Sequence, residues 1–277
     1  MLIIFCQTQY RFLSQSEGAF FDESAGILYV TALNYSSTPC CSQVSLLVID
    51  LSTDTFVRGY PLPLNNFTKS SLFLDSSTGG KRLLFHSYNG ANEYLVSFNP
   101  STGAITTLFP FPNGYTYQGP SFSFNTASRE VSGVFKINSG NGPSLAYLSM
   151  NVDTGISHSV TLSDPAPLVL YFDSSSATFY SIISSPTDTS HVQLMNFDPT
   201  LGKSSPLSGG SPIIALPSPL STASAIDTLG GVAYVYSSTG ATPSDILEVT
   251  TLELSSGKMA ASPFRVLSQH GTFLLYL

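Results

Sequence analysis

The chain has 277 residues, of which 42% are hydrophobic and 10% are charged, and its formal net charge is −7. The hydrophobic content argues against a disordered chain, and the length suffices for a sizeable core within one domain. Its ten Lys and Arg residues form no basic cluster, which argues against nucleic acid and against an anionic membrane surface as partners.

The N-terminal residues 1–13 begin with an apolar patch but carry no basic segment and no small-residue cleavage site. We therefore expect a β-strand here rather than an intact signal peptide. No apolar run of the chain reaches the roughly 18 residues of a membrane-spanning helix, so we expect no membrane insertion.

Cysteines and glycosylation sequons bear on the compartment. The cysteines are Cys6, Cys40 and Cys41. Because three cannot all pair, we expect structural thiols, or one disulfide from Cys6 to either of the others in an exported chain. Sequons at Asn34 and Asn66 make glycosylation at these positions an expectation and favour an extracellular or secretory location.

Two motifs recur along the chain. In the first, a hydrophobic run ends in an acidic or amide residue and leads into small polar residues; it ends at Asp22, Asp75, Asn125, Asp173 and Asp227, which are 48 to 54 residues apart. The second, as in "YLVSFNPSTGAITTL", ends its run at Asp50, Asn99, Asn151, Asp198 and Glu253, 47 to 55 residues apart. Two independent motifs with one period of about 50 indicate an internal repeat.

Each motif has the features of a β-hairpin. Its flanks alternate between apolar and polar residues, as strands do, and its Asp or Asn can bond the backbone of a turn in which glycines such as Gly103 adopt positive φ. Each repeat therefore has four short strands, A to D, with the first motif joining A to B and the second joining C to D. The repeats span approximately residues 17–66, 67–117, 118–166, 167–218 and 219–267.

Five repeats of four antiparallel strands predict an all-β fold, a β-propeller of about five blades in a single domain, residues 1–277. End strands are expected at residues 1–13 and 270–277. They either complete a blade that closes a ring of five, or begin a sixth blade; truncation of a longer protein is a further alternative.

The second motif and its relatives resemble the strand–turn–strand unit of generic propeller repeats, the broad group of quinoprotein-like, kelch-like and lactonase-like propellers. The Trp that closes a quinoprotein repeat, the Gly-Gly pair of kelch repeats and the Trp-Asp mark of WD repeats are missing. The resemblance thus implies the fold, and it carries over no family's catalytic residues.

Variable loops of such a scaffold are the usual place for binding, and here the B–C and D–A loops are longer and more varied than the A–B and C–D turns. Aromatic and polar residues of two such loops are the predicted ligand-binding residues, because tyrosine combines an apolar ring with a polar tip. They are His86, Tyr88, Asn89 and Glu93 in "HSYNGANE", and Tyr115, Tyr117 and Gln118 in "PNGYTYQGPSF".

Other constellations give weaker signals for chemistry. The repeated carboxylates, Asp22, Asp75, Asp173 and Asp227, either cap turns or ring the axis and bind a cation. His86 and His191 are expected in equivalent B–C loops, without a zinc motif. No Gly-x-Ser-x-Gly or phosphate-loop pattern occurs. We therefore predict no catalytic residue, no metal site and no cofactor.

The favoured function is a non-catalytic binding module that recognises a protein or a glycan through its B–C and D–A loop face. One alternative is a hydrolase or lyase with an axial, metal-assisted site, which follows from analogy with other propellers alone. The other is a structural coat or matrix protein. Neither ligand identity nor oligomeric state can be predicted from these residues.

Overall fold

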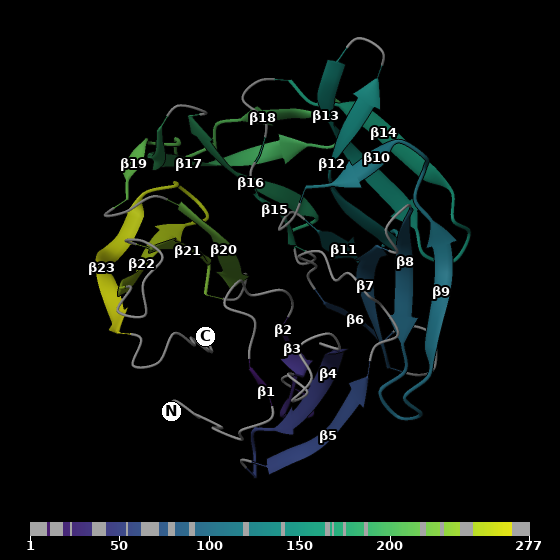
Figure 1. Ribbon diagram of the computed structural model, residues 1–277. Helices are drawn as coiled ribbons and strands as arrows, with labels where there is room; N and C mark the ends of the chain where they lie inside the picture. The colour runs from purple at the N-terminus through teal and green to yellow at the C-terminus, as the bar shows by residue number, and fades with distance from the viewer. Residues whose placement is uncertain are drawn as a thin grey trace. The chain divides into compact units, whose positions relative to one another are not determined.

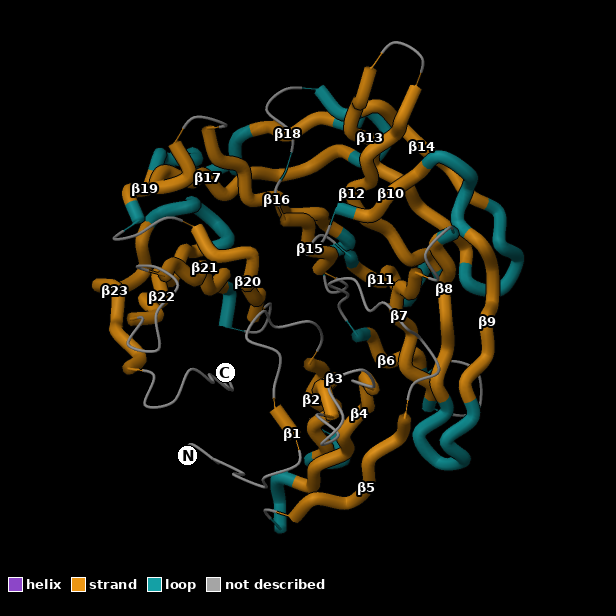
Figure 2. Tube along the Cα trace, in the orientation of Figure 1, coloured by secondary structure: helices purple, strands orange, loops and turns teal. Residues whose placement is uncertain are grey.

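A computed structural model of the chain describes residues 10–11, 19–22, 24–34, 43–53, 55–61, 72–76, 81–88, 92–118, 122–139, 142–163, 167, 169–173, 176–185, 188–216, 220–227, 230–238 and 246–267. Within these ranges the chain consists of strands, turns and loops, without any helix (Figure 2). None of the described residues therefore belongs to a helix long and apolar enough to cross a membrane.

The predicted fold is confirmed: the chain is an all-β protein whose five antiparallel sheets are the blades of a β-propeller (Figure 1). Two sheets have four strands and three have five. The chain divides into two compact units, of which the first ends at Asn113 and the second begins at Gly114. That all five blades form one domain stays a prediction.

The first unit contains blades 1 and 2. In blade 1 the order is β1-β3-β4-β5, and β2 pairs with β3 beside β1. In blade 2 the order is β6-β7-β8-β9. The strands are β1 (Tyr10–Arg11), β2 (Ala19–Asp22), β3 (Ile27–Asn34), β4 (Gln43–Asp50), β5 (Thr55–Pro61), β6 (Phe73–Asp75), β7 (Arg82–Tyr88), β8 (Glu93–Phe98) and β9 (Ile105–Pro110).

The second unit contains blades 3, 4 and 5. Their orders are β10-β12-β13-β14 with β11 also on β12, β15-β16-β17-β18 with β19 also on β17, and β20-β21-β22-β23. The strands are β10 (Tyr115–Tyr117), β11 (Ser123–Asn125), β12 (Glu130–Ser139), β13 (Gly142–Asn151), β14 (Ser157–Thr161), β15 (Val169–Asp173), β16 (Thr178–Ser185), β17 (Asp188–Asp198), β18 (Lys203–Ser205), β19 (Ile214–Ala215), β20 (Leu220–Asp227), β21 (Val232–Ser238), β22 (Ile246–Glu253) and β23 (Met259–Leu267).

Two details differ from the sequence-based expectation. Strand β10 pairs with β12, so Tyr115–Tyr117 belong to blade 3, although the expected boundary at residue 117 places them in the second repeat. Of the expected end strands, 270–277 lies outside the described residues, and in 1–13 only Tyr10–Arg11 is described; it pairs with the far end of β3. In blades 1 and 3 the A strand is therefore split into two pieces on one partner.

The C–D turns are closed by the residue that ends strand C, as predicted. In blade 2 the Oδ1 of Asn99 accepts the N–H groups of Ser101 (2.9 Å) and Thr102 (3.2 Å), and Gly103, with φ of 75°, donates its N–H to the Asn99 carbonyl (2.8 Å). The same side-chain acceptor closes three further turns, at Asp50, Asn151 and Asp198. This is the Asx turn that small acidic and amide side chains favour.

The repeated carboxylates at the ends of the A strands also bind their own blade or its neighbour. Asp22 accepts from Ser24 (2.6 Å), Asp75 from Arg82 Nε (2.8 Å), Asp173 from Ser176 (2.6 Å) and Asp227 from the N–H of Gly230 (2.8 Å). The bonds of Asp22, Asp173 and Asp227 are those of turn caps, whereas Asp75 forms an ion pair with Arg82, the residue opposite it in β7. Among the described residues, no three His, Cys, Asp or Glu side chains are grouped as metal ligands would be.

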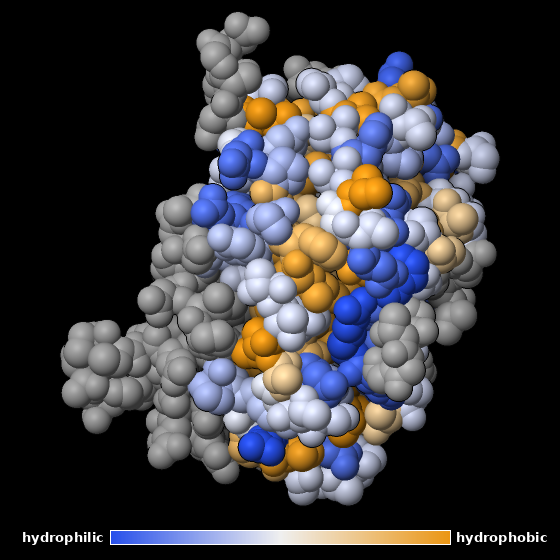
Figure 3. Space-filling view, turned by 90° about the vertical axis from the view of Figure 1, so that its right-hand side faces the viewer, coloured by the Kyte–Doolittle hydropathy of each residue, from blue (hydrophilic) through white to orange (hydrophobic). Residues whose placement is uncertain are grey.

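The core of the first unit lies between the two blades. Tyr29, Leu46 and Val48 of blade 1 pack with Phe85 and Phe98 of blade 2, all at most 8% exposed. Burial of this kind stabilises a fold by about 25 cal/mol per Å² of apolar surface. On the face that Figure 3 presents, apolar groups are separated by polar side chains.

Candidate functional site

One face of blade 1 forms the floor of the candidate site. Tyr29 in β3 lies opposite Val48 in β4, and Val48 lies opposite Arg58 in β5, so the three side chains form a row across the sheet. Ile27 and Tyr60 stand two residues along their strands from this row and share its face, because side chains of a strand alternate. The row thus places a phenol, an isopropyl group and a guanidinium side by side.

A β-bulge at Val57 adds a side chain to this face. Val48 pairs with Arg58 while Ile49 pairs with Phe56, which leaves Val57 opposite no residue. In a regular strand Val57 and Arg58 would point to opposite faces, but both line the same cavity. A bulge re-aims a side chain in this way, and it leaves Val57 57% exposed.

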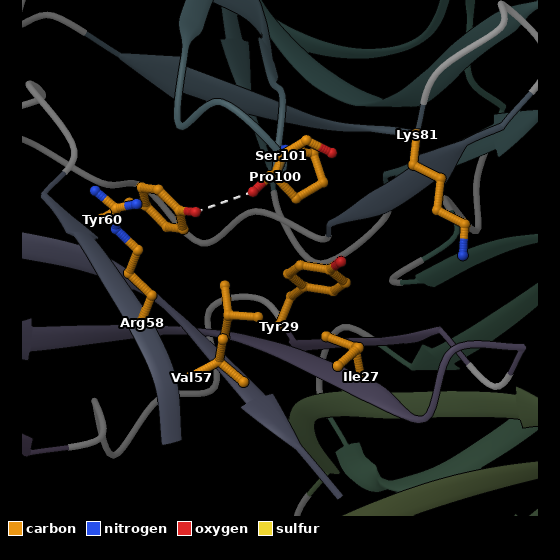
Figure 4. Close-up of a pocket in the computed structure, with 9 residues that line it drawn as sticks. Ile27, Tyr29, Val57, Arg58, Tyr60, Lys81, Pro100 and Ser101 are labelled. Carbon is orange, nitrogen blue, oxygen red and sulfur yellow. Dashed lines mark hydrogen bonds between the residues drawn. The ribbon is translucent and has the colours of Figure 1, made fainter. Parts of the chain in front are cut away.

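The cavity lies where the packing of blade 1 on blade 2 opens, and its volume is about 410 Å³. Blade 2 contributes Lys81, at the end of its A–B turn, and Pro100 and Ser101 from its C–D turn. In Figure 4, Tyr29 is central, with Arg58 and Tyr60 to one side and Lys81 to the other. This is the turn end of the blades, opposite the B–C and D–A loop face that the sequence favoured.

Two hydrogen-bond donors of the cavity have capacity for a ligand. Tyr29 is 5% exposed, and its hydroxyl bonds no described residue; Figure 4 shows it directed toward the side of Lys81. Burial raises the pKa of Tyr29, and Asp22 and Tyr60 raise it further, so the phenol is a neutral donor. Arg58 is exposed and has no carboxylate partner among the described residues.

Tyr60 holds Arg58 in place. The guanidinium carbon of Arg58 lies 4.9 Å from the centre of the Tyr60 ring, a cation–π distance. The ring meets Phe98 edge to face at 4.8 Å, and its hydroxyl donates to the carbonyl of Pro100 at 2.9 Å. A Cβ on Gly103 would approach the ring to 2.6 Å, so the glycine of the C–D turn leaves room for Tyr60.

Lys81, in contrast, is held by an ion pair with Asp22 and also donates to Ser24 Oγ at 3.2 Å. Asp22 is 3% exposed and accepts the N–H of Ala25 at 3.3 Å as well. Burial would raise the pKa of Asp22, but the hydrogen bonds from Lys81 and Ser24 and the charge of Lys81 outweigh it and lower the pKa. The ammonium of Lys81 is therefore neutralised within the first unit.

His86 and Glu93, two of the predicted ligand-binding residues, bind each other. His86 Nε2 and Glu93 Oε2 form a hydrogen bond between β7 and β8, with side chains 0% and 5% exposed. The ring of Phe111 lies 5.8 Å from that of His86. The expectation that His86 and His191 occupy B–C loops is wrong: they lie within β7 and β17, because both strands extend further than the sequence pattern indicates.

The remaining predicted residues are placed as follows. Tyr88 is half-buried at the end of β7, and Asn89 lies outside the described residues. Tyr115 and Tyr117 lie in β10 rather than in a D–A loop; the Tyr115 hydroxyl donates to Ser159 Oγ at 2.9 Å, and Tyr117 is 7% exposed. Gln118 is exposed and donates to the carbonyl of Tyr117. A ligand-binding role for this set stays a prediction.

Glycosylation and disulfide formation stay predictions as well. Asn34 is the last residue of β3, and its side chain is not described. Asn66 and the cysteines, Cys6, Cys40 and Cys41, lie outside the described residues.

The residues of the cavity were missed from the sequence. Arg58 is an isolated charge two residues from Tyr60, whereas Lys81 is followed directly by Arg82, in a chain with only ten Lys and Arg residues. That scarcity was the available signal, since an isolated cation beside tyrosines marks a place where a charge has a specific use. The bulge that brings Val57 and Arg58 together has no mark in the sequence, because it depends on the register with β4.

Comparison with known proteins supports the fold. No family model and no curated protein matches the sequence. Among solved structures, TolB from Acinetobacter baumannii is 14% identical with a TM-score of 0.54, covering 92% of this chain and 54% of its own. An oligogalacturonate lyase in complex with manganese is 11% identical with a TM-score of 0.51, covering 91% of this chain and 65% of its own.

A third structure is that of regucalcin, a calcium-binding protein from Agrobacterium tumefaciens, at 14% identity and a TM-score of 0.52, covering 91% of this chain and 76% of its own. This chain thus spans less than two thirds of TolB and of the lyase. At such identities the likeness shows the propeller fold, which this chain shares with proteins of diverse activities.

Proposed function

We propose that this chain is a binding module without a reaction of its own, and that it recognises a protein or a glycan group through the cavity of blades 1 and 2. The observation that supports this is the pair of donors at the cavity: the Tyr29 hydroxyl and the Arg58 guanidinium have no partner of their own among the described residues. Both groups line the cavity, so a ligand would bond them without displacing a hydrogen-bond partner from the protein.

The setting of these donors is suited to binding. Ile27, Val48 and Val57 give the cavity an apolar floor, and pockets for ligands combine such surfaces with a few placed polar groups. Tyr29 and Val48 belong to the core between the blades, so the floor is rigid before any ligand arrives. Rigid sites bind with a smaller loss of conformational entropy.

The carboxylate of Asp22, which pairs with the lining residue Lys81, is engaged within the protein, and this favours binding over general acid–base catalysis by Asp22. Asp22 bonds Lys81, Ser24 and the backbone of Ala25. Its lowered pKa keeps it charged and fixed at neutral pH, whereas a catalytic base works best with a pKa near that pH.

The test is a pair of arrays, one of glycans and one of peptides, probed with the full chain and with Val57→Trp. The exposed Val57 stands on the bulge, so tryptophan should fill the cavity without entering the core. Ile156→Trp is the matched control, since Ile156 is 73% exposed in the C–D turn of blade 3. We expect binding that Val57→Trp abolishes and Ile156→Trp preserves; binding that both variants retain would contradict the proposal.

A further inference from the structure

We infer that the cavity of blades 1 and 2 binds a hydroxylated carboxylate of the size of one acidic sugar residue, with its carboxylate on Arg58 and a hydroxyl on Tyr29. This rests on the proposed function, because it names the ligand class for the same site. The proposed ligand is an acidic sugar, either free or at the end of a glycan, rather than an acidic peptide.

The charge of the cavity selects a single negative charge. Lys81 and Asp22 cancel each other through their ion pair. The positive charge of Arg58 is not balanced, because no described carboxylate forms an ion pair with it. Among the described residues, the net balance at the cavity is therefore one positive charge, which matches a carboxylate better than the two charges of a phosphate monoester.

The geometry of Arg58 favours a planar anion. A guanidinium presents two parallel N–H groups that fit both oxygens of a carboxylate. Stacking on Tyr60 at 4.9 Å restrains the guanidinium, and Tyr60 is itself fixed by Phe98 and by the carbonyl of Pro100. The fork of donors is thus oriented before a ligand arrives.

The neutral hydrogen-bond donors of the cavity favour a ligand that carries hydroxyl groups in addition to its carboxylate. The Tyr29 hydroxyl, in a mostly buried position, would remain unpaired against a wholly apolar ligand, at an energetic cost. Ser101 adds a second hydroxyl at the rim of the cavity. A glutamate side chain offers a carboxylate but no hydroxyl for these groups, whereas a sugar ring offers both.

The volume of the cavity and its aliphatic floor are suited to a single sugar ring. Its volume of about 410 Å³ is near the lower end of the range of about 300–1,000 Å³ for small-molecule pockets. Ile27, Val48 and Val57 supply aliphatic surface, against which the C–H face of a sugar ring can pack. A single acidic residue therefore fits the cavity, and further residues of a glycan would extend outside it.

The experiment is titration calorimetry of the full chain with five probes: glucuronate, a linear uronate tetramer, glucose, glucose 6-phosphate and N-acetylglutamate amide. We expect both uronates to bind and the three others to bind at least tenfold more weakly. A tetramer that binds like the monomer indicates a free sugar as ligand, and a tighter tetramer indicates a glycan; both support the inference.

Variants assign the binding to the named groups. Arg58→Gln should weaken glucuronate binding about tenfold to a hundredfold, and Tyr29→Phe about fivefold, as for charged and neutral hydrogen bonds. Lys203→Gln removes one exposed charge from β18, in the second unit, and should change nothing. Circular dichroism would confirm that each variant is folded.

Several outcomes would overturn the inference. They are equal affinity for glucose and glucuronate, preference for the phosphate or the glutamate probe, an unchanged affinity in Arg58→Gln, or no uronate binding up to about 10 mM. The affinity of Val57→Trp for the probe that the unchanged chain binds most tightly would distinguish a failure of the ligand class from a failure of the proposed function. If glucose or N-acetylglutamate amide binds and Val57→Trp abolishes that binding, the cavity is a binding site for another ligand class. If no binding depends on Val57, the proposed function fails too.

Discussion

The replacement of Gly103 by alanine tests how the C–D turn of blade 2 supports the cavity. Gly103 has φ of 75°, and a left-handed backbone costs a residue with a Cβ about 1–2 kcal/mol. In addition, its Cβ would lie 2.6 Å from Cε1 and 2.8 Å from Cδ1 of Tyr60. Overpacking of this kind costs about 1–3 kcal/mol, so we expect the free energy of unfolding to fall by about 2–5 kcal/mol.

A matched variant separates the backbone cost from the cost of overpacking against Tyr60. Gly26 has φ of 68°, and within the described part of the chain its Cβ would meet only Ser52 Cβ, at an ordinary 3.7 Å. Gly26→Ala should therefore lower the free energy of unfolding only by the cost of a left-handed backbone, about 1–2 kcal/mol. Since the three atoms nearest to a Cβ at Gly103 all belong to the Tyr60 ring, the excess cost of Gly103→Ala should disappear in a Tyr60→Val background.

The assay is urea unfolding followed by circular dichroism and tyrosine fluorescence, which suits a chain with 14 Tyr and no Trp. Midpoints and slopes give each free energy, and equal slopes show that only stability changed. The reasoning is refuted if Gly103→Ala costs no more than Gly26→Ala, or if its excess cost persists without the Tyr60 ring.

Three further predictions concern ionisable groups. His86→Leu should lower the free energy of unfolding by about 3–5 kcal/mol, because Glu93 loses its buried partner, whereas leucine at both positions should cost less than either single change; additive costs in a double-mutant cycle would contradict this. The pKa of Asp22 is lowered from 3.8, so its pair with Lys81 stabilises the fold above about pH 4 and is lost as the pH falls below it. Urea unfolding at pH 3 and pH 7 should show a smaller acid loss in Lys81→Met than in the unchanged chain, and an equal loss would refute the role of the pair. Burial raises the pKa of Tyr147 from 10.0 to about 12, so the stability contributed by Tyr147 is full below about pH 10 and falls by about 2 kcal/mol by pH 12. Tyr147→Phe should remove this alkaline loss, and an unchanged loss would count against it.

The turns and the repeat could be predicted because their causes are local. Asn99 closes its turn through groups two to four residues away, so the same short pattern marks the turn wherever it occurs. The alternation of apolar and polar residues along a strand is also local, and five repeats with one period are compatible with few folds. The turn caps of Asp22, Asp173 and Asp227 could be predicted for the same reason, because each bonds a residue two or three positions away.

What the sequence could not predict depends on partners distant in the chain. Tyr115–Tyr117 form a strand because β12 offers them an edge, and nothing within the segment distinguishes a strand from a loop. The pair of His86 with Glu93 requires the register of β7 with β8. The cavity requires a bulge in blade 1 and a turn of blade 2 together, so neither repeat alone indicates it.

The construction of the C–D turns has a consequence for how such a site could diversify. The bonds that close the turn of blade 2 use the side chains of Asn99 and Thr102 and backbone groups, and none uses the side chains of Pro100 or Ser101. Those two side chains nevertheless line the cavity. Substitutions at these positions can therefore alter the shape of the rim while the hairpin keeps its conformation, so ligand preference and fold stability can be varied separately, by natural selection or by design.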